Sequence, residues 1–231
     1  MNSEECIYLP SISDTSSEFK ISGSEVNHLK ALRIRIGEFL MVSSGAGMMY
    51  RCIVSGIGAK DYTCRTLEAL PEFGENSVNS ALALGIIENR ERFEFALEKA
   101  VELGINDFYP LVCDYSQKKV VNIDRLRTKA IAAMCQTRRS RLPDIHNPLN
   151  LNELLNQSKY NKIVIAEQSL KTNYIISDSS LILLIGPEGG FSEKELSIII
   201  DRKNTEILNL GPRRLRAETA AITGLTKILL V

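Results

Sequence analysis

The stretch LILLIGPEGGFS, residues 181–192, decides the fold class. Its first five residues are continuously apolar and partly β-branched, which is typical of a strand buried inside a parallel sheet. The glycines that follow let the backbone turn sharply and approach a ligand closely, because they lack a Cβ. Ser192 is a favourable N-cap, with Glu193 and Glu195 in the first turn of the helix it would begin. The stretch predicts either a ligand-binding loop at the carboxyl end of a parallel strand or simply a tight strand-to-helix turn.

A second stretch, LNLGPRRLRAETAA at residues 208–221, has the same order of strand, glycine turn and helix start. Three arginines lie in its turn, and Glu218 and Thr219 lie in the first turn of the predicted helix. Taken alone, Glu218 would only complement the helix dipole, and the arginines would only face solvent. The recurrence of one architecture in both stretches favours a shared ligand site. The first stretch is neither a phosphate loop nor a dinucleotide fingerprint, since it lacks both glycine patterns.

The segments around these stretches alternate between apolar strands and amphipathic helices, which predicts an α/β domain on a mainly parallel sheet. The expected strands are Ala81–Ile87, Asp107–Val112, Lys162–Ala166, Leu181–Ile185 and Glu206–Leu210. The expected helices are Arg90–Leu103, Asp124–Arg139, Ser192–Arg202 and Ala217–Leu230.

The N-terminal part of the chain is richer in strand formers and turn residues. Phe39–Ser43, Met48–Gly56 and Tyr62–Leu67 are expected strands, and Ser22 with Glu25 has capping-box spacing for a short helix ending near Arg33. The polar stretch LPEFGENSVN, with a proline and a glycine, is the candidate linker. We therefore expect a β-rich domain over residues 1–70, a linker over 71–79 and the α/β domain over 80–231.

The composition excludes several classes of protein. Lys and Arg number 28 and Asp and Glu also number 28, so a globally basic nucleic-acid coat is absent and an RNA site must come from local clustering. The five cysteines show no C-x-x-C spacing, and His28 and His146 stand alone, so neither a metal site nor a disulfide framework is expected. No apolar run is long enough for a signal sequence or a membrane span. These features favour a soluble cytoplasmic protein with reduced thiols.

The two quoted stretches resemble the signature loops of the RsmE family, the bacterial 16S ribosomal RNA uridine-N3 methyltransferases of the SPOUT group. The resemblance continues through four further segments in the same order along the chain. They are SGSEVNHLKALRIRIGE (22–38), FALEKAVELGI (95–105), DFYPLVCDYS (107–116) and QTRRSRLPDIHNP (136–148). Tyr115, Cys135 and Val101 depart from the family pattern, so the roles of those positions are not transferred.

The resemblance implies a trefoil-knotted, mainly parallel SPOUT domain preceded by a small PUA-like β-barrel that binds RNA. It implies S-adenosylmethionine as cofactor, no metal, a homodimer formed through the knotted domain, and 16S ribosomal RNA or the small ribosomal subunit as partner. The loops Gly186–Gly190 and Gly211–Ala220 would form the knot and hold the cofactor. The implied cofactor-binding residues are Leu184, Gly186, Pro187, Glu188, Gly189, Leu210, Gly211, Leu215, Arg216, Thr219 and Ala220.

Methylation of a weakly acidic uridine N3–H requires removal of its proton and stabilisation of the resulting negative charge. Glu218 is the candidate for orienting the base or accepting the proton, and Arg216 for stabilising the charge on the uracil oxygens. A purely structural contact between Glu218 and Arg216 is the alternative.

RNA binding is expected where basic residues cluster locally, although each one could equally be a solvated surface charge. The candidates are Lys118, Lys119, Arg138, Arg139 and Arg141, extended by Arg33 and Arg35 in the first domain. Three other functions stay open. They are a non-catalytic RNA-binding knot protein, a doubly wound nucleotide-binding enzyme, and a SPOUT methyltransferase acting on another RNA or on a ribose hydroxyl.

Overall fold

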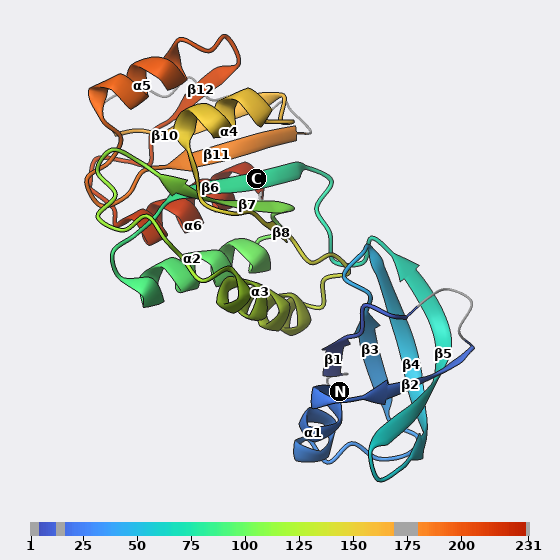
Figure 1. The fold of residues 1–231 in the computed structure, drawn as a ribbon. Coiled ribbons are helices and arrows are strands. Elements are labelled where there is room, and N and C mark those ends of the chain that lie inside the picture. The colour runs from blue at the N-terminus through green and yellow to red at the C-terminus, as the bar shows by residue number, and fades with distance from the viewer. Residues whose placement is uncertain (1–4, 13–16, 169–179, 230–231) are drawn as a thin grey trace. The chain divides into compact units, whose positions relative to one another are not determined.

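The computed structural model describes residues 5–12, 17–168 and 180–229 (Figure 1). The chain divides into two compact units. The first comprises residues 1–75 together with 134–142, and the second comprises residues 76–133 together with 143–231. This division differs from the linear boundaries expected from the sequence, because a short segment from the middle of the chain belongs to the first unit.

The first unit is a five-stranded sheet in the order β1-β3-β4-β5-β2, with one helix. Its elements are β1 (Glu5–Tyr8), β2 (Glu18–Ser22), α1 (Ser24–Ala31), β3 (Phe39–Ser43), β4 (Met48–Ile57) and β5 (Asp61–Pro71). β1 and β3 are parallel and the other pairs are antiparallel. The register of β4 against β5 shifts twice, and such bulges increase the twist of a sheet. The result is the curled β unit that the sequence predicts, with β1 and β2 as further strands (Figure 1).

The start of α1 differs from the expected capping box. Ser22 is the last residue of β2, where it pairs with Asp61, and it makes no cap. The N-cap is Gly23, whose positive φ of 75° turns the chain directly from strand into helix without a side-chain hydrogen bond. The prediction that Ser22 caps the helix is therefore wrong, because Ser22 is already paired within the β2–β5 ladder.

Residues 134–142 are fixed in the first unit by two arginine–glutamate pairs. Arg139 is only 1% exposed, and its Nη2 donates to Oε2 of Glu75 at 2.6 Å. Arg141 pairs with Glu72, and its backbone N–H donates to Oε1 of Glu75 at 2.9 Å. The hydroxyl of Ser43 donates to the Arg139 carbonyl at 2.9 Å. The expected linker thus supplies two carboxylates that anchor a distant part of the chain.

The second unit is built on a seven-stranded sheet, and all pairs of neighbouring strands in its described residues are parallel. The order is β12-β10-β11-β6-β7-β8, with β9 also beside β7. Its strands are β6 (Asn79–Gly85), β7 (Asp107–Val112), β8 (Asp144–Ile145), β9 (Leu149–Asn150), β10 (Lys162–Ala166), β11 (Ser180–Ile185) and β12 (Thr205–Leu208). Its helices are α2 (Arg90–Glu102), α3 (Ile123–Thr137, whose end belongs to the first unit), α4 (Leu151–Gln157), α5 (Glu193–Ile200) and α6 (Ala217–Leu229). The α/β prediction is confirmed, while α4, β8 and β9 were not expected.

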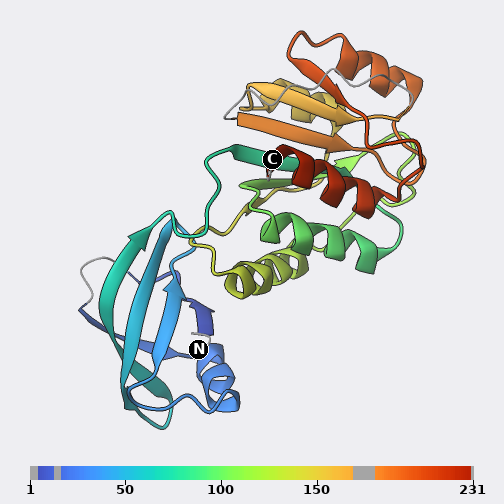
Figure 2. The same ribbon diagram turned by 180° about the vertical axis from the view of Figure 1, so that it is seen from behind.

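Helices cover both faces of this sheet. α4 and α5 lie on one face, where Leu154 and Ile199 join a buried cluster with inward-facing strand residues such as Ile182 (Figure 1). α2 and α6 lie together on the other face (Figure 2). Gly224 of α6 lies directly over Leu183, since a Cβ there would meet its Cδ2 at 2.8 Å. The sheet is consequently buried on both sides, which explains the continuously apolar strands.

The described part of the chain contains no helix that is both long and apolar enough to cross a bilayer. Its His, Cys, Asp and Glu side chains form no group of three that could hold a metal ion. All five cysteines are free thiols.

A buried carboxylate lies at the beginning of β7. Asp107 is 1% exposed, with Nε2 of His146 at 2.6 Å and the Lys159 ammonium at 3.0 Å, and it accepts a hydrogen bond from the Tyr160 hydroxyl. Burial alone would raise the pKa of this carboxyl, but the hydrogen bonds from its partners lower the pKa to about 2. Asp107 therefore joins β7 to the segments on either side of α4 as a charged group.

We expect Asp107→Asn to destabilise the chain by about 2 kcal/mol at neutral pH, the equivalent of the lowered pKa. A carboxyl whose pKa is lowered by folding stabilises the fold at pH values above its unfolded pKa of about 4. This stabilisation disappears as the pH falls towards 2. The difference between variant and wild type should thus shrink between these two pH values. Urea titrations followed by circular dichroism at pH 7, 4 and 3 would measure it, and a constant difference would contradict the assignment.

Candidate active site

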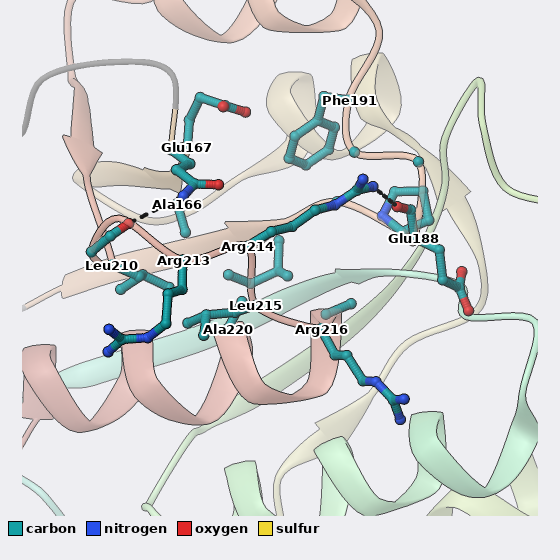
Figure 3. A pocket seen from close by; sticks show the side chains of 18 of the residues that line it. Ala166, Glu167, Glu188, Phe191, Leu210, Arg213, Arg214, Leu215, Arg216 and Ala220 are labelled. Atoms are coloured by element: carbon teal, nitrogen blue, oxygen red, sulfur yellow. Dashed lines mark hydrogen bonds between the residues drawn. The ribbon is translucent and has the colours of Figure 1, made fainter.

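The carboxyl ends of three adjacent parallel strands meet at one edge of the second unit. β12, β10 and β11 are neighbours in the sheet, and the segments leaving them line a common cavity of about 640 Å³. These segments are Ala166–Gln168, Gly186–Gly190 and the turn from Leu210 into α6 (Figure 3). The two stretches singled out in the sequence thus lie together at the carboxyl edge of the sheet, which is where parallel sheets usually bind ligands.

The first loop, Gly186–Gly190, is tightly packed against neighbouring backbone. An added Cβ at Gly186 would lie 2.9 Å from the carbonyl carbon of Gly190. Gly190 has a φ of +76°, and its N–H donates to the Pro187 carbonyl at 2.9 Å. The glycines are required here because the loop folds onto itself before α5 begins.

The predicted N-cap also connects this loop to the segment that follows β7. Ser192 and Glu195 form a complete capping box at the start of α5. The Ser192 hydroxyl also donates to Oδ2 of Asp114 at 2.5 Å, and the Asp114 N–H donates to Oε1 of Glu195 at 3.1 Å. Tyr115 lies beside Gly189, because a Cβ added to this glycine would lie 2.8 Å from the Cβ of the tyrosine. Tyr115, which departs from the family pattern, therefore contacts the loop Gly186–Gly190.

The second loop is held by hydrogen bonds to both neighbouring segments. Asn209 accepts from the Gly211 N–H at 2.8 Å, and its amide donates to the Gln168 carbonyl at 3.0 Å. Gly211 has a φ of +108°, in the region that favours glycine. Arg214 reaches across the cavity, and its Nη2 donates to the Glu188 carbonyl at 2.9 Å (Figure 3). The cavity is thus fixed by contacts between the loops themselves.

The lining combines apolar walls with a few polar groups, as small-molecule sites usually do. Apolar lining comes from residues of all three segments and of α5: Ala166, Ile185, Phe191, Leu196, Leu210, Leu215 and Ala220. Two glutamates and four arginines supply charge: Glu167, Glu188, Arg92, Arg213, Arg214 and Arg216. In Figure 3 the side chain of Arg216 points towards α2 and away from that of Arg213.

Glu218 is bound by an arginine that the sequence did not single out. Nε and Nη2 of Arg92 each donate to one Glu218 carboxylate oxygen at 2.7 Å. The glutamate is 8% exposed at the start of α6, and Arg92 lies in the first turn of α2. Burial would raise the Glu218 pKa, but hydrogen bonds from Arg92 and from its own backbone N–H, with the charges of Arg92 and Arg216, lower it below the ordinary value. The carboxylate is ionised and already paired, which makes it a weak proton acceptor.

Nine of the eleven expected cofactor-binding residues line the cavity. They are Gly186, Pro187, Glu188, Gly189, Leu210, Gly211, Leu215, Arg216 and Ala220. Leu184 does not, because its side chain is fully buried in the core on the α4–α5 face. Thr219 does not either, because the helical phase turns it to solvent between the buried Glu218 and the half-buried Ala220. Arg92 and Glu167 were missed, since only the strand order brings them beside the glycine loops.

The expected RNA-binding residues differ in how far their side chains are exposed to solvent. Arg33, Arg35, Lys118 and Lys119 are exposed, although the Lys118 ammonium donates to the Glu88 carbonyl at 2.6 Å. Arg138 is partly buried and has a φ of 55°. The prediction that Arg139 binds RNA is wrong, because its guanidinium is buried against Glu75 and cannot reach a phosphate. The Arg141 guanidinium is likewise paired, with Glu72.

Comparison with known proteins connects this site with a defined group. A family model described as an RNA methyltransferase domain matches residues 74–229, and one described as an RNA methyltransferase PUA domain matches residues 21–67. The chain is 30% identical to ribosomal RNA small subunit methyltransferase E of Rickettsia conorii, across 97% of this chain and 95% of the relative. It is 31% identical to the protein of that name from Mesomycoplasma hyopneumoniae, across 90% and 92%. A putative methyltransferase from Legionella pneumophila, solved with bound cofactor SAM, superimposes with a TM-score of 0.86 at 26% identity, across 97% and 96% of the two chains.

Proposed function

Because this chain belongs to the ribosomal RNA small subunit methyltransferase E family, we propose that it transfers a methyl group from S-adenosylmethionine to N3 of a uridine in 16S ribosomal RNA. The observation that carries the proposal is the cavity that the two glycine loops form at the carboxyl ends of β11 and β12, on either side of β10. The substrate is 16S RNA, within the assembled small subunit, and the reaction is a step of ribosome biogenesis.

The residues of the cavity fit this cofactor in size and chemistry. A volume of about 640 Å³ lies within the range of small-ligand sites. Leu210, Leu215 and Ala220 provide an apolar surface for a purine, and the loop backbone provides donors and acceptors for the ribose. Arg213 offers a cation for the amino-acid carboxylate. When bound, the cofactor supplies a methyl group on a sulfonium, which is reactive without a metal ion.

The protein's own contribution is orientation and charge. Fixed loops hold two reactants at a defined distance, which can supply a large part of a rate enhancement. Arg216 lines the cavity and places a positive charge near the reacting groups. The exposed Arg33 and Arg35 of the first unit and Lys118 and Lys119 of the second bind RNA phosphates.

Three further expectations belong to the proposal. The loops Gly186–Gly190 and Gly211–Ala220 form a trefoil knot, the enzyme is a homodimer through the knotted domain, and it works in the cytoplasm. All three follow from the family resemblance and stay predictions. A non-catalytic RNA-binding protein is the alternative function, and it would leave the cavity without a cofactor.

Calorimetric titration with S-adenosylmethionine, S-adenosylhomocysteine and ATP tests the proposal. We expect saturable binding of both sulfur compounds and none of ATP, because the loops carry no phosphate-binding pattern. Incubation of the protein with small subunits that lack the modification should then place the methyl group on a uridine N3. Absence of binding would favour the RNA-binding alternative, and a methyl group on another atom would contradict the assigned reaction.

A further inference from the structure

A second cavity adjoins the cofactor cavity and shares two of its residues, Arg92 and Glu188. It is a shallower hollow, more open to solvent, and its volume is also about 640 Å³. Asn89, Arg90 and Lys118 are among its other lining residues, and its lining is charged or polar throughout. A polar cavity that adjoins the proposed cofactor cavity has the place and the chemistry of a site for a nucleotide.

Arg92 stands at the junction of the two cavities in a fixed orientation. Two of its nitrogens, Nε and Nη2, are held by the two Glu218 oxygens. Nη1 has no hydrogen-bond partner among the residues that the structure describes. The bidentate pair thus fixes the guanidinium plane and leaves one nitrogen available at the junction.

We propose that the second cavity receives the target uridine and that Nη1 of Arg92 stabilises the negative charge on a uracil oxygen as N3 loses its proton. This inference rests on the proposed function. N3–H gives its proton to water, the N3 electron pair forms the bond to the methyl carbon, and the carbon–sulfur bond breaks with its electron pair remaining on sulfur. Arg92 is the catalytic residue of this step, and Glu218 is a positioning residue.

Arg92 suits this role better than Arg216 because its geometry is already fixed. Preorganised donors stabilise developing charge without reorganising during the reaction. The Arg216 side chain is exposed, and it lines only the cofactor cavity. Arg92 faces the carboxylates of Glu218 and Glu188, which keep it charged, and the charge of Arg216 also acts on Glu218.

The test compares Arg92→Ala and Arg92→Lys with the wild type. The readout is the single-turnover rate of methyl transfer to unmodified small subunits, saturated with enzyme and cofactor. We expect Arg92→Ala to lower the rate by about 100-fold or more, as loss of an oxyanion donor does, with cofactor affinity almost unchanged. Arg92→Lys keeps the positive charge but not the planar guanidinium with its two parallel donors, and it should lower the rate by about 10-fold.

The pH dependence separates this role from a structural one. Stabilisation of the anion lowers the pKa of the bound uridine N3–H, so the wild-type rate levels off at a lower pH than the variant rate. The defect of Arg92→Ala should therefore be largest at low pH and should shrink as pH rises. A purely structural pair would give a defect of the same size at every pH.

Arg125→Lys is the matched control. Arg125 forms the same bidentate pair with Glu94, at 2.5 and 2.9 Å, and Glu94 is 4% exposed. Neither residue lines the two cavities. The control should keep the rate within about twofold, since Lys keeps the charge opposite Glu94 and neither residue of the pair lines the two cavities.

A wild-type rate in Arg92→Ala, or a loss that does not vary with pH, would overturn the inference. So would a loss in Arg125→Lys as large as that in Arg92→Lys. These outcomes are distinct from failure of the proposed function, which would appear first as wild-type protein that binds no S-adenosylmethionine.

Discussion

Gly85→Ala is expected to weaken S-adenosylmethionine binding by about 100-fold, although Gly85 does not itself line the cavity. Gly85 ends β6, and an ideal Cβ there would lie 2.5 Å from Cδ of Pro187 and closer still to its backbone nitrogen. Both groups belong to the chain that turns out of β11 into the first glycine loop. The added methyl group can only be accommodated if this loop moves, and the loop is part of the cofactor site.

Calorimetric titration of the variant measures this effect, and circular dichroism shows whether the fold is kept. Gly56→Ala is a suitable control, because the nearest atom to its added Cβ is Cβ of Thr63 at an ordinary 3.5 Å. The control should bind the cofactor as the wild type does. Wild-type affinity in Gly85→Ala would show that the loop can move without loss of the site.

The second large effect concerns stability. Glu75→Ala removes the carboxylate that pairs with the Arg139 guanidinium, and both side chains are at least 95% buried. Breaking a buried ion pair from one side typically costs about 3–5 kcal/mol, because a charge stays in the interior without its partner. Glu75 also accepts the backbone N–H of Arg141, so the anchor of residues 134–142 is lost with it.

Urea unfolding of the full chain, followed by circular dichroism, measures this loss. Glu72→Ala is the matched control, since the pair of Glu72 with Arg141 is 54% and 42% exposed and an exposed pair contributes at most about 1 kcal/mol. Glu75→Gln should lie between the two, because it keeps a hydrogen-bonding side chain without the charge. Equal destabilisation by Glu75→Ala and Glu72→Ala would contradict the buried-pair account.

The parts of the site that could be predicted from the sequence are those that depend on local chemistry. The Gly186–Gly190 and Gly211 turns follow apolar strands directly, and Ser192 caps α5 as its spacing with Glu195 indicates. Each of these features is contained in a dozen consecutive residues. The same is true of the parallel strands, whose apolar runs report burial on both faces.

The parts that could not be predicted depend on the order of strands and on pairs distant in sequence. Glu167 enters the cavity only because β10 lies between β11 and β12. Arg92 is 126 residues from its partner Glu218, and nothing in the local pattern of α2 distinguishes it from its neighbours. Arg139 was assigned to the RNA surface because it lies in a local cluster of basic residues, and its burial depends on Glu75.

The membership of residues 134–142 in the first unit has a consequence for synthesis of the protein. The chain leaves the first unit after residue 75, returns at residue 134 and leaves again after residue 142. A ribosome that has released only the N-terminal third of the polypeptide has therefore not yet released the arginine that Glu75 pairs with. The first unit cannot form its buried Glu75–Arg139 pair during translation until the α2–β7–α3 segment has emerged, so the N-terminal unit must wait for part of its neighbour to be made.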